Sequence, residues 1–168
     1  MTKLKFYGNK FFLILFFIFL LLLDGQISFL LSSFFNYHFM ISSQLLMLVA
    51  MFLYKEQSEI FTFCSFCLFG FIFESYYLGE IGIITVILPV LMHLVLKLDK
   101  QFLNSPFQTF LVYAVLMFSY NITSYVLARA YGWGNTPLAQ FVTYSLCPTL
   151  IFNLLVYGIC HKFLRRFI

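Results

Sequence analysis

Long runs of apolar residues, separated by short polar stretches, make up most of this chain. Six runs are long enough to form helices that cross a membrane, which takes about 20 mostly apolar residues each. They cover approximately residues 11–35, 39–54, 60–77, 81–98, 107–128 and 138–160. They are far longer than the alternating strands of an outer-membrane barrel. The pattern therefore predicts an all-α polytopic membrane protein, with six transmembrane helices in one bundle and a single transmembrane domain over residues 1–168.

The composition supports this class. Hydrophobic residues account for 62% of the 168 residues and charged residues for 10%, against about 45–50% and 25% in an ordinary soluble domain. So few charges could not keep such a surface in water, which excludes a soluble globular domain, a disordered chain and a nucleic-acid-binding protein. The four cysteines all lie in apolar runs, so no disulfide framework is expected.

The lysines and arginines predict the orientation of the chain, because cytoplasmic loops carry an excess of them. If the N-terminus is cytoplasmic, every Lys and Arg except Arg129 falls on the inner side. Both termini are then cytoplasmic, as an even number of spans requires. The basic tail formed by Lys162, Arg165 and Arg166 is expected to anchor against anionic lipid, and a docking peptide for a cytoplasmic partner is the alternative.

Polar residues within the predicted spans are the candidates for function, because charges inside a bilayer are costly. Counting 1.5 Å per residue from the span ends places a polar layer in the outer half of the bilayer. Its members are Asp24, Gln44, Glu74, Asn121 and Tyr144, together with Thr85 and Thr143. Two interpretations stay open: a site that binds a partner or ligand, or a hydrogen-bonded plug that fixes the register of the helices.

The third predicted span carries small residues on one side. Cys64, Cys67 and Gly70 share a helical face with Glu74, and small residues allow helices to pack closely. We expect a helix-packing face here, since no second Cys or His pair accompanies the C-x-x-C spacing that a metal or redox site would need. After this span, Gly79 and Gly82 are expected to allow a tight outer hairpin.

Motifs of known catalytic sites do not occur in the sequence. It contains no H-E-x-x-H, no G-x-S-x-G and no Gly-rich phosphate loop. Asp24 and Glu74 are able in principle to perform acid–base chemistry, but nothing supplies a nucleophile or a metal beside them. The sequence therefore predicts a protein that is not an enzyme and needs no cofactor or metal, with neither a nucleic acid nor a small-molecule substrate as partner.

Three stretches resemble a known family. They are Asp24-Gly25-Gln26, the segment GFIFESYYLGEIG over residues 70–82, and Pro148-Thr149 followed by Asn153. Together with the length, the six spans and the short loops, they make the chain similar to MreD, the membrane protein of the bacterial rod-shape or elongation machinery. Glu74 stands where the family usually has an aspartate, whose side chain is one methylene shorter.

The resemblance implies a non-enzymatic scaffold, a multi-pass protein of the bacterial plasma membrane. MreD-like proteins associate with MreC, a bitopic protein. They work with the MreB filament and with the glycosyltransferase RodA and its transpeptidase in lateral peptidoglycan synthesis, which controls cell shape. The expected direct partners are thus membrane lipid and an MreC-like protein. The MreB-like filament, the RodA-like glycosyltransferase and its transpeptidase are expected as indirect partners. The resemblance also implies a fold similar to the substrate-binding subunits of energy-coupling-factor transporters.

Two other functions compete with the scaffold. The first is the substrate-binding subunit of a vitamin-type transporter, which would need a ligand-sized cavity open to the outside and lined by Asp24, Glu74 and Asn121. A filled core at that level would favour the scaffold instead. The second is an intramembrane enzyme acting on a lipid or a peptide, whose turnover would be lost in Glu74→Gln.

Overall fold

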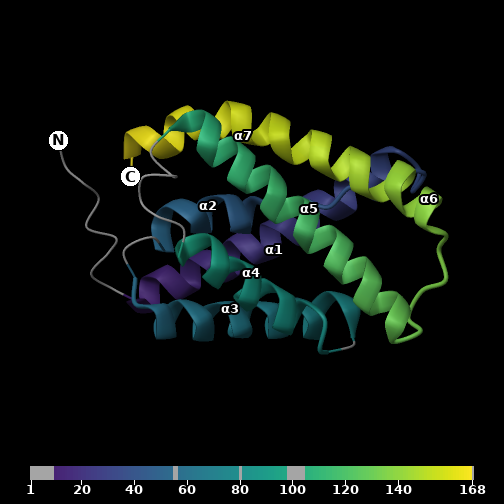
Figure 1. Cartoon of the computed structure of the whole chain (residues 1–168), viewed down its shortest axis with the longest axis horizontal. Helices are drawn as coiled ribbons and strands as arrows, with labels where there is room; N and C mark the ends of the chain where they lie inside the picture. The colour runs from purple at the N-terminus through teal and green to yellow at the C-terminus, as the bar shows by residue number, and fades with distance from the viewer. Residues whose placement is uncertain (1–9, 55–56, 80, 98–104, 168) are drawn as a thin grey trace.

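The computed structural model describes residues 10–54, 57–79, 81–97 and 105–167, with side chains described as far as His161. Within these residues all regular secondary structure is helical, and the helices pack side by side in one elongated bundle (Figure 1). This confirms the predicted all-α class.

Four helical segments are long and apolar enough to cross a membrane. They are α1 (Lys10–Phe34), α3 (Glu59–Phe73) with its π-helical end η3 (Glu74–Leu78), α5 (Pro106–Ala130), and the continuous run of α6 (Leu138–Phe141), η4 (Val142–Leu146) and α7 (Cys147–Phe167). Each coincides with one of the six predicted spans.

The other two helices of the described chain are short. α2 (Leu45–Leu53) has 9 residues and α4 (Ile84–Lys97) has 14. At 1.5 Å per residue they are about 14 and 21 Å long, less than the roughly 30 Å of the hydrocarbon core. In the span predicted over 39–54, residues 40–44 have no regular secondary structure and the helix begins only at Leu45. Residues 40–44 are named the non-helical segment below.

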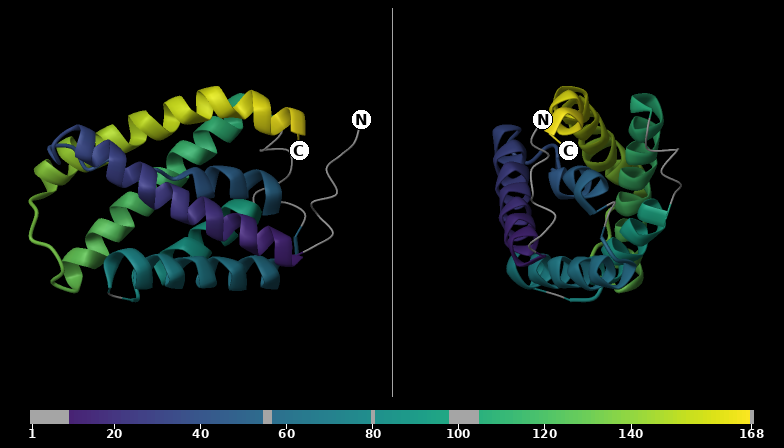
Figure 2. Two further views of the ribbon diagram at one scale, coloured as in Figure 1. Left: turned by 180° about the vertical axis from the view of Figure 1, so that it is seen from behind. Right: turned by 90° about the vertical axis from the view of Figure 1, so that its left-hand side faces the viewer.

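The two ends of the described chain lie at the same end of the bundle (Figures 1 and 2). The first turn of α1, the last turn of α4 and the end of α7 all lie at this end, whereas the loop between α5 and α6 lies at the opposite end. Among the cations with described side chains, Lys10 and Lys97 therefore belong to the end shared by the termini, and Arg129 belongs to the other. Lys97 pairs there with Glu59, with an N–O distance of 3.7 Å.

α2 lies in the interior of the bundle, where it is covered by the longer helices. Leu48 and Ala50 have no exposed surface. At the end of α2, the Tyr54 ring meets the Phe17 ring of α1 edge-on at 5.0 Å, and Phe17 stacks on Phe69 of α3 at 5.7 Å. Irregular backbone is tolerated at membrane depth only where protein surrounds it. The burial of α2 therefore surrounds the short helix and the non-helical segment before it with protein.

Candidate functional site

The Asp24 carboxylate, in the second half of α1, holds the start of α2. Its Oδ1 accepts hydrogen bonds from the Leu45 N–H at 2.9 Å and from the Ser43 hydroxyl at 2.6 Å, and its Oδ2 accepts one from the Leu46 N–H at 2.8 Å. Asp24 is only 5% exposed. The first N–H groups of a helix have no partner within the helix, and the helix dipole favours a negative charge beside them. Asp24 is thus an N-terminal cap that a neighbouring helix provides.

Two side chains of α7 bind the backbone of the non-helical segment. Asn153 accepts a hydrogen bond from the Gln44 N–H at 2.9 Å and donates one to the Ser42 carbonyl at 2.7 Å. Thr149 accepts one from the Ser42 N–H at 3.1 Å and donates one to the Met40 carbonyl at 3.3 Å. Backbone polar groups inside a bilayer must find partners within the protein. Because alternate residues of the segment face α7, two side chains satisfy four of its backbone groups.

Further bonds hold the same segment from α1 and α5. Ser28 of α1 accepts a hydrogen bond from the Ser43 N–H at 2.8 Å and donates one to the Asp24 carbonyl at 2.6 Å. The Tyr113 hydroxyl of α5 donates to the Gln44 carbonyl at 3.2 Å. Three of the long helices, α1, α5 and α7, therefore converge on the start of α2.

The start of α4 is built in the same way around Glu74, which has no exposed surface. Its Oε1 accepts hydrogen bonds from the N–H groups of Ile83, at 2.7 Å, and of Ile84. Its Oε2 accepts from the Gly82 N–H at 2.9 Å, from the Thr85 N–H at 3.3 Å and from the Thr85 hydroxyl. Each of the two short helices thus begins at a buried carboxylate from the long helix that precedes it in the chain.

Two glycines beside these carboxylates permit close approach of neighbouring helices. A Cβ on Gly25 would overlap the ring of Tyr77, whose hydroxyl donates to the Leu22 carbonyl at 3.1 Å. A Cβ on Gly70 would lie 2.6 Å from the Cα of Thr85, closer than real Cβ contacts come. Gly25 therefore fits α1 against η3, and Gly70 fits α3 against the first turn of α4.

The turn between η3 and α4 requires glycine at two positions. Gly79 has a φ of 71° and Gly82 a φ of 133°, a region that side chains rarely adopt. The turn aims the N–H groups at 82–85 back at Glu74, so both glycines take part in the capping of α4.

The predicted polar layer is divided in the structure into two clusters. Asp24 and Gln44 lie together at the start of α2, and Glu74 lies with Thr85 at the start of α4. Between them the two clusters satisfy the first backbone groups of the short helices.

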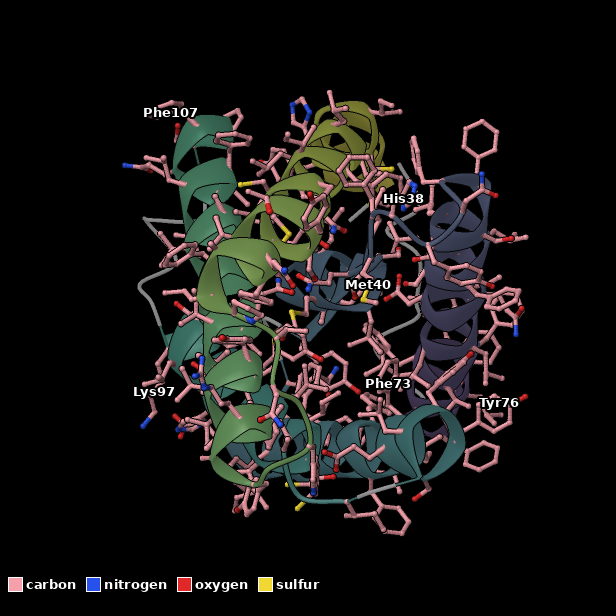
Figure 3. All side chains as sticks on the ribbon, turned by 90° about the vertical axis from the view of Figure 1, so that its right-hand side faces the viewer. His38, Met40, Phe73, Tyr76, Lys97 and Phe107 are labelled. Atoms are coloured by element: carbon pink, nitrogen blue, oxygen red, sulfur yellow. The ribbon has the colours of Figure 1, made fainter. Side chains whose placement is uncertain are left out.

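Three predicted members of the layer make no side-chain bond to either cluster. Thr143 is exposed, and its hydroxyl donates to the Ala139 carbonyl one turn earlier at 2.9 Å. Asn121 is buried in α5 and donates to the carbonyl of Met117 in its own helix at 2.8 Å. The Tyr144 side chain is 51% exposed, and its carbonyl accepts a hydrogen bond from the Met40 N–H at 2.8 Å. Viewed from the end opposite the termini, Met40 and Phe73 lie over the centre of the bundle, whereas Tyr76 lies on its outside (Figure 3).

Of the three residues on the predicted small face, Gly70 makes the close contact with α4 described above. Cys64 is exposed and Cys67 is partly exposed, so α3 directs these two thiols outward. The basic tail residues Lys162, Arg165 and Arg166 lie on the last turns of α7, whose side chains are outside the described part of the structure.

Several residues that hold the site carry no assigned role in the sequence analysis. Ser28, Ser43 and Tyr113 are among them, and Thr149 and Asn153 enter only through the family resemblance. A local signal for the start of α2 does exist. Ser42, Ser43 and Gln44 come directly before nine apolar residues, and serine is a preferred residue at a helix N-terminus.

A cavity of about 40 Å³ lies between the starts of α2 and α4. Asp24, Gln44, Ile84 and Tyr120 are among its lining residues, and neither Glu74 nor Asn121 lines it. Pockets for drug-sized ligands measure about 300–1,000 Å³, so this cavity is too small for a vitamin. Within the described residues, no group of three or more His, Cys, Asp and Glu side chains is placed to hold a metal ion.

Comparison with known proteins identifies the family of the chain. The family described as rod shape-determining protein MreD matches residues 5–168. The cell shape-determining protein MreD of Streptococcus pneumoniae (strain ATCC BAA-255 / R6) is 35% identical over 138 residues, which cover 82% of this chain and 83% of that protein. No solved structure matches the chain, so the similarity to energy-coupling-factor subunits stays a prediction. From the match along nearly its whole length, the chain belongs to the MreD family of cell shape-determining proteins.

Proposed function

We propose that this chain is a non-enzymatic membrane scaffold of the cell-elongation (rod) complex. In this function it binds an MreC-like bitopic partner and, through that partner, supports lateral peptidoglycan synthesis together with an MreB-like filament and a RodA-like glycosyltransferase with its transpeptidase. Membership in the MreD family is the observation that carries the proposal. The geometry supports it, because the buried polar residues hold helices in place.

The structure disfavours a vitamin-type transporter subunit. The buried carboxylates of Asp24 and Glu74 already accept hydrogen bonds from backbone N–H groups at the starts of α2 and α4. The cavity beside Asp24 has room for about 40 Å³, where a ligand pocket would need several hundred. The same occupancy argues against acid–base catalysis by Asp24 or Glu74, since a reacting carboxyl has to face its substrate.

We place the end of the bundle that holds the termini in the cytoplasm of a bacterial cell. Lys10 and Lys97 lie at that end, and Arg129 lies at the other. Excess positive charge on the cytoplasmic side is the rule for multi-pass proteins of the plasma membrane. The basic tail of α7 extends this end, where anionic lipid is available to Lys162, Arg165 and Arg166.

We propose that the transmembrane helix of the bitopic partner binds in an apolar groove between α4 and α5. It has a volume of about 330 Å³ and is lined by Leu91, Leu94, Val95, Leu111, Val112, Val115, Leu116 and Ser119. Helices in lipid associate through close packing, and a groove admits a row of side chains from one further helix. The face that contains Gly70 offers no such groove, because the start of α4 already covers that glycine.

Affinity purification of the tagged chain from its native membrane tests the scaffold itself. Recovery of an MreC-like protein with RodA-like partners is expected. Recovery of an ATPase pair with a large transmembrane coupling protein would overturn the proposal in favour of the transporter.

Site-specific photocrosslinking tests the groove. A photoreactive amino acid at Leu94 or Val115, which are 57% and 64% exposed, is expected to crosslink the MreC-like partner. Ile159 on α7 is the matched control, because it is 78% exposed and lies away from the groove. Crosslinks from Ile159 with none from the two groove positions would keep the scaffold and move the partner to another face.

A further inference from the structure

The Gln44 side chain is an unpaired polar group in the interior of the bundle. Gln44 is 4% exposed, and neither its amide nitrogen nor its amide oxygen has a hydrogen-bond partner among the protein atoms. Its backbone is fixed, because its N–H is bonded to Asn153 and its carbonyl to Tyr113. The backbone of Gln44 is therefore held in the interior at the start of α2.

An unpaired amide at this depth is costly. A side-chain amide has two donors and an acceptor oxygen with two lone pairs, and burial of such a group without partners costs roughly 2–7 kcal/mol. The group lines the cavity between the starts of α2 and α4. A polar molecule in that cavity thus lies next to a residue whose side-chain amide lacks partners within the protein.

We propose that this cavity is a binding site for internal water molecules. One water molecule needs about 10–15 Å³ of cavity volume. The cavity of about 40 Å³ therefore has room for about three water molecules. A buried water also needs two to four polar partners. The Gln44 amide, the Asp24 carboxylate, Ser42 and the Tyr120 hydroxyl all belong to residues that line the cavity.

Water fits this site better than an ion or a lipid chain does. Both carboxyl oxygens of Asp24 already accept hydrogen bonds from the N–H groups of Leu45 and Leu46, so the site does not need a cation. An acyl chain would leave the Gln44 amide unpaired. Apart from the polar residues named above and Ser43, the lining is apolar and includes Met47 and Leu88.

X-ray radiolysis of the full chain in lipid nanodiscs tests the proposal. Radiolysis turns bound water into hydroxyl radicals, which oxidise the methionines that they touch to the sulfoxide. Met47 lines the cavity and is 4% exposed. Met51 and Met92, which are 2% and 0% exposed and do not line the cavity, are controls matched in burial. Sulfoxide formation is followed by peptide mass spectrometry.

With water in the cavity, Met47 is expected to oxidise several-fold faster than Met51 and Met92. Gln44→Leu removes the polar anchor and is expected to lower the Met47 rate to that of the controls. Leu88→Phe fills part of the same cavity and is expected to have the same effect if Gln44→Leu fails to fold. Equal rates at the three methionines of the natural chain would overturn the proposal, as would a Met47 rate that neither variant changes.

Discussion

Replacement of Asp24 by leucine is the sharpest test of how α2 is held. The change keeps a side chain of similar length and removes every acceptor that caps the helix. The Ser43 hydroxyl is free to rotate to another acceptor, but the N–H groups of Leu45 and Leu46 lose their partner. A buried donor left unpaired costs about 1–3 kcal/mol, so the two together cost about 2–6 kcal/mol. That is a large share of the roughly 5–15 kcal/mol by which proteins are stable.

Two measurements follow this change. Equilibrium unfolding by SDS in mixed micelles, read by far-UV circular dichroism, gives the loss of free energy of unfolding. Hydrogen exchange read by mass spectrometry gives its location, with faster exchange expected at residues 44–46. Asn121→Leu is the matched control: Asn121 is a buried polar residue in a long helix, but its amide donates only to the Met117 carbonyl of its own helix. Its expected cost is about 1 kcal/mol or less.

Asp24→Asn is expected to lower the free energy of unfolding by an intermediate amount. The amide oxygen is able to replace Oδ1 and accept from Leu45 and Ser43, but the NH₂ group then faces the N–H of Leu46. One donor is lost, so the expected cost is about 1–3 kcal/mol, between those of the control and of Asp24→Leu. An Asp24→Leu protein that unfolds at the SDS concentration of the natural chain, with unchanged exchange at 44–46, would show that the carboxylate does not hold α2.

The other predictions concern the remaining contacts of the two clusters. Glu74→Gln is expected to speed hydrogen exchange at 82–85 while leaving 44–46 unchanged, and faster exchange at both places would mean that the clusters are coupled. Gly25→Ala is expected to lower stability in the SDS assay by about 1–3 kcal/mol through overpacking against the Tyr77 ring. Most of this loss should disappear when Tyr77→Ala is the background, and an unchanged loss would rule out that contact. Asn153→Leu leaves the Gln44 N–H and the Ser42 carbonyl unpaired and should cost about 2–6 kcal/mol, with exchange rising at Gln44 and not at residues 82–85.

The amino-acid pattern predicts the helical class and the long helices well, because length and hydropathy decide which segments cross a bilayer. It does not predict that the segment over 39–54 is half helix. Ile41, Leu45 and their neighbours are apolar enough for a continuous span. The break at residues 40–44 depends on acceptors and donors from α1 and α7, including Thr149, which follows Ser42 by 107 residues.

The sequence likewise predicts the candidate site only in part. Depth counting selects Asp24, Gln44 and Glu74, and all three are buried in the structure. A polar or charged residue in an apolar run is a strong signal. Depth alone does not say what a carboxylate contacts. Asp24 and Glu74 lie in different clusters since each binds the short helix that follows its own long helix. That pairing depends on the turn at 35–39 and on the glycines at 79 and 82.

The bonds between the non-helical segment and α7 have a consequence for biosynthesis. Ribosomes add about 5–20 residues per second, so Thr149 and Asn153 are synthesised roughly 5–20 seconds after their partners Ser42 and Gln44. During that interval the backbone of residues 40–44 lacks its bonds to Thr149 and Asn153, and a bilayer offers no substitute. Integration of the second segment is therefore completed only when the last one arrives. A chain that stops before α7 should remain a substrate for membrane proteases and chaperones, however apolar its first five segments are.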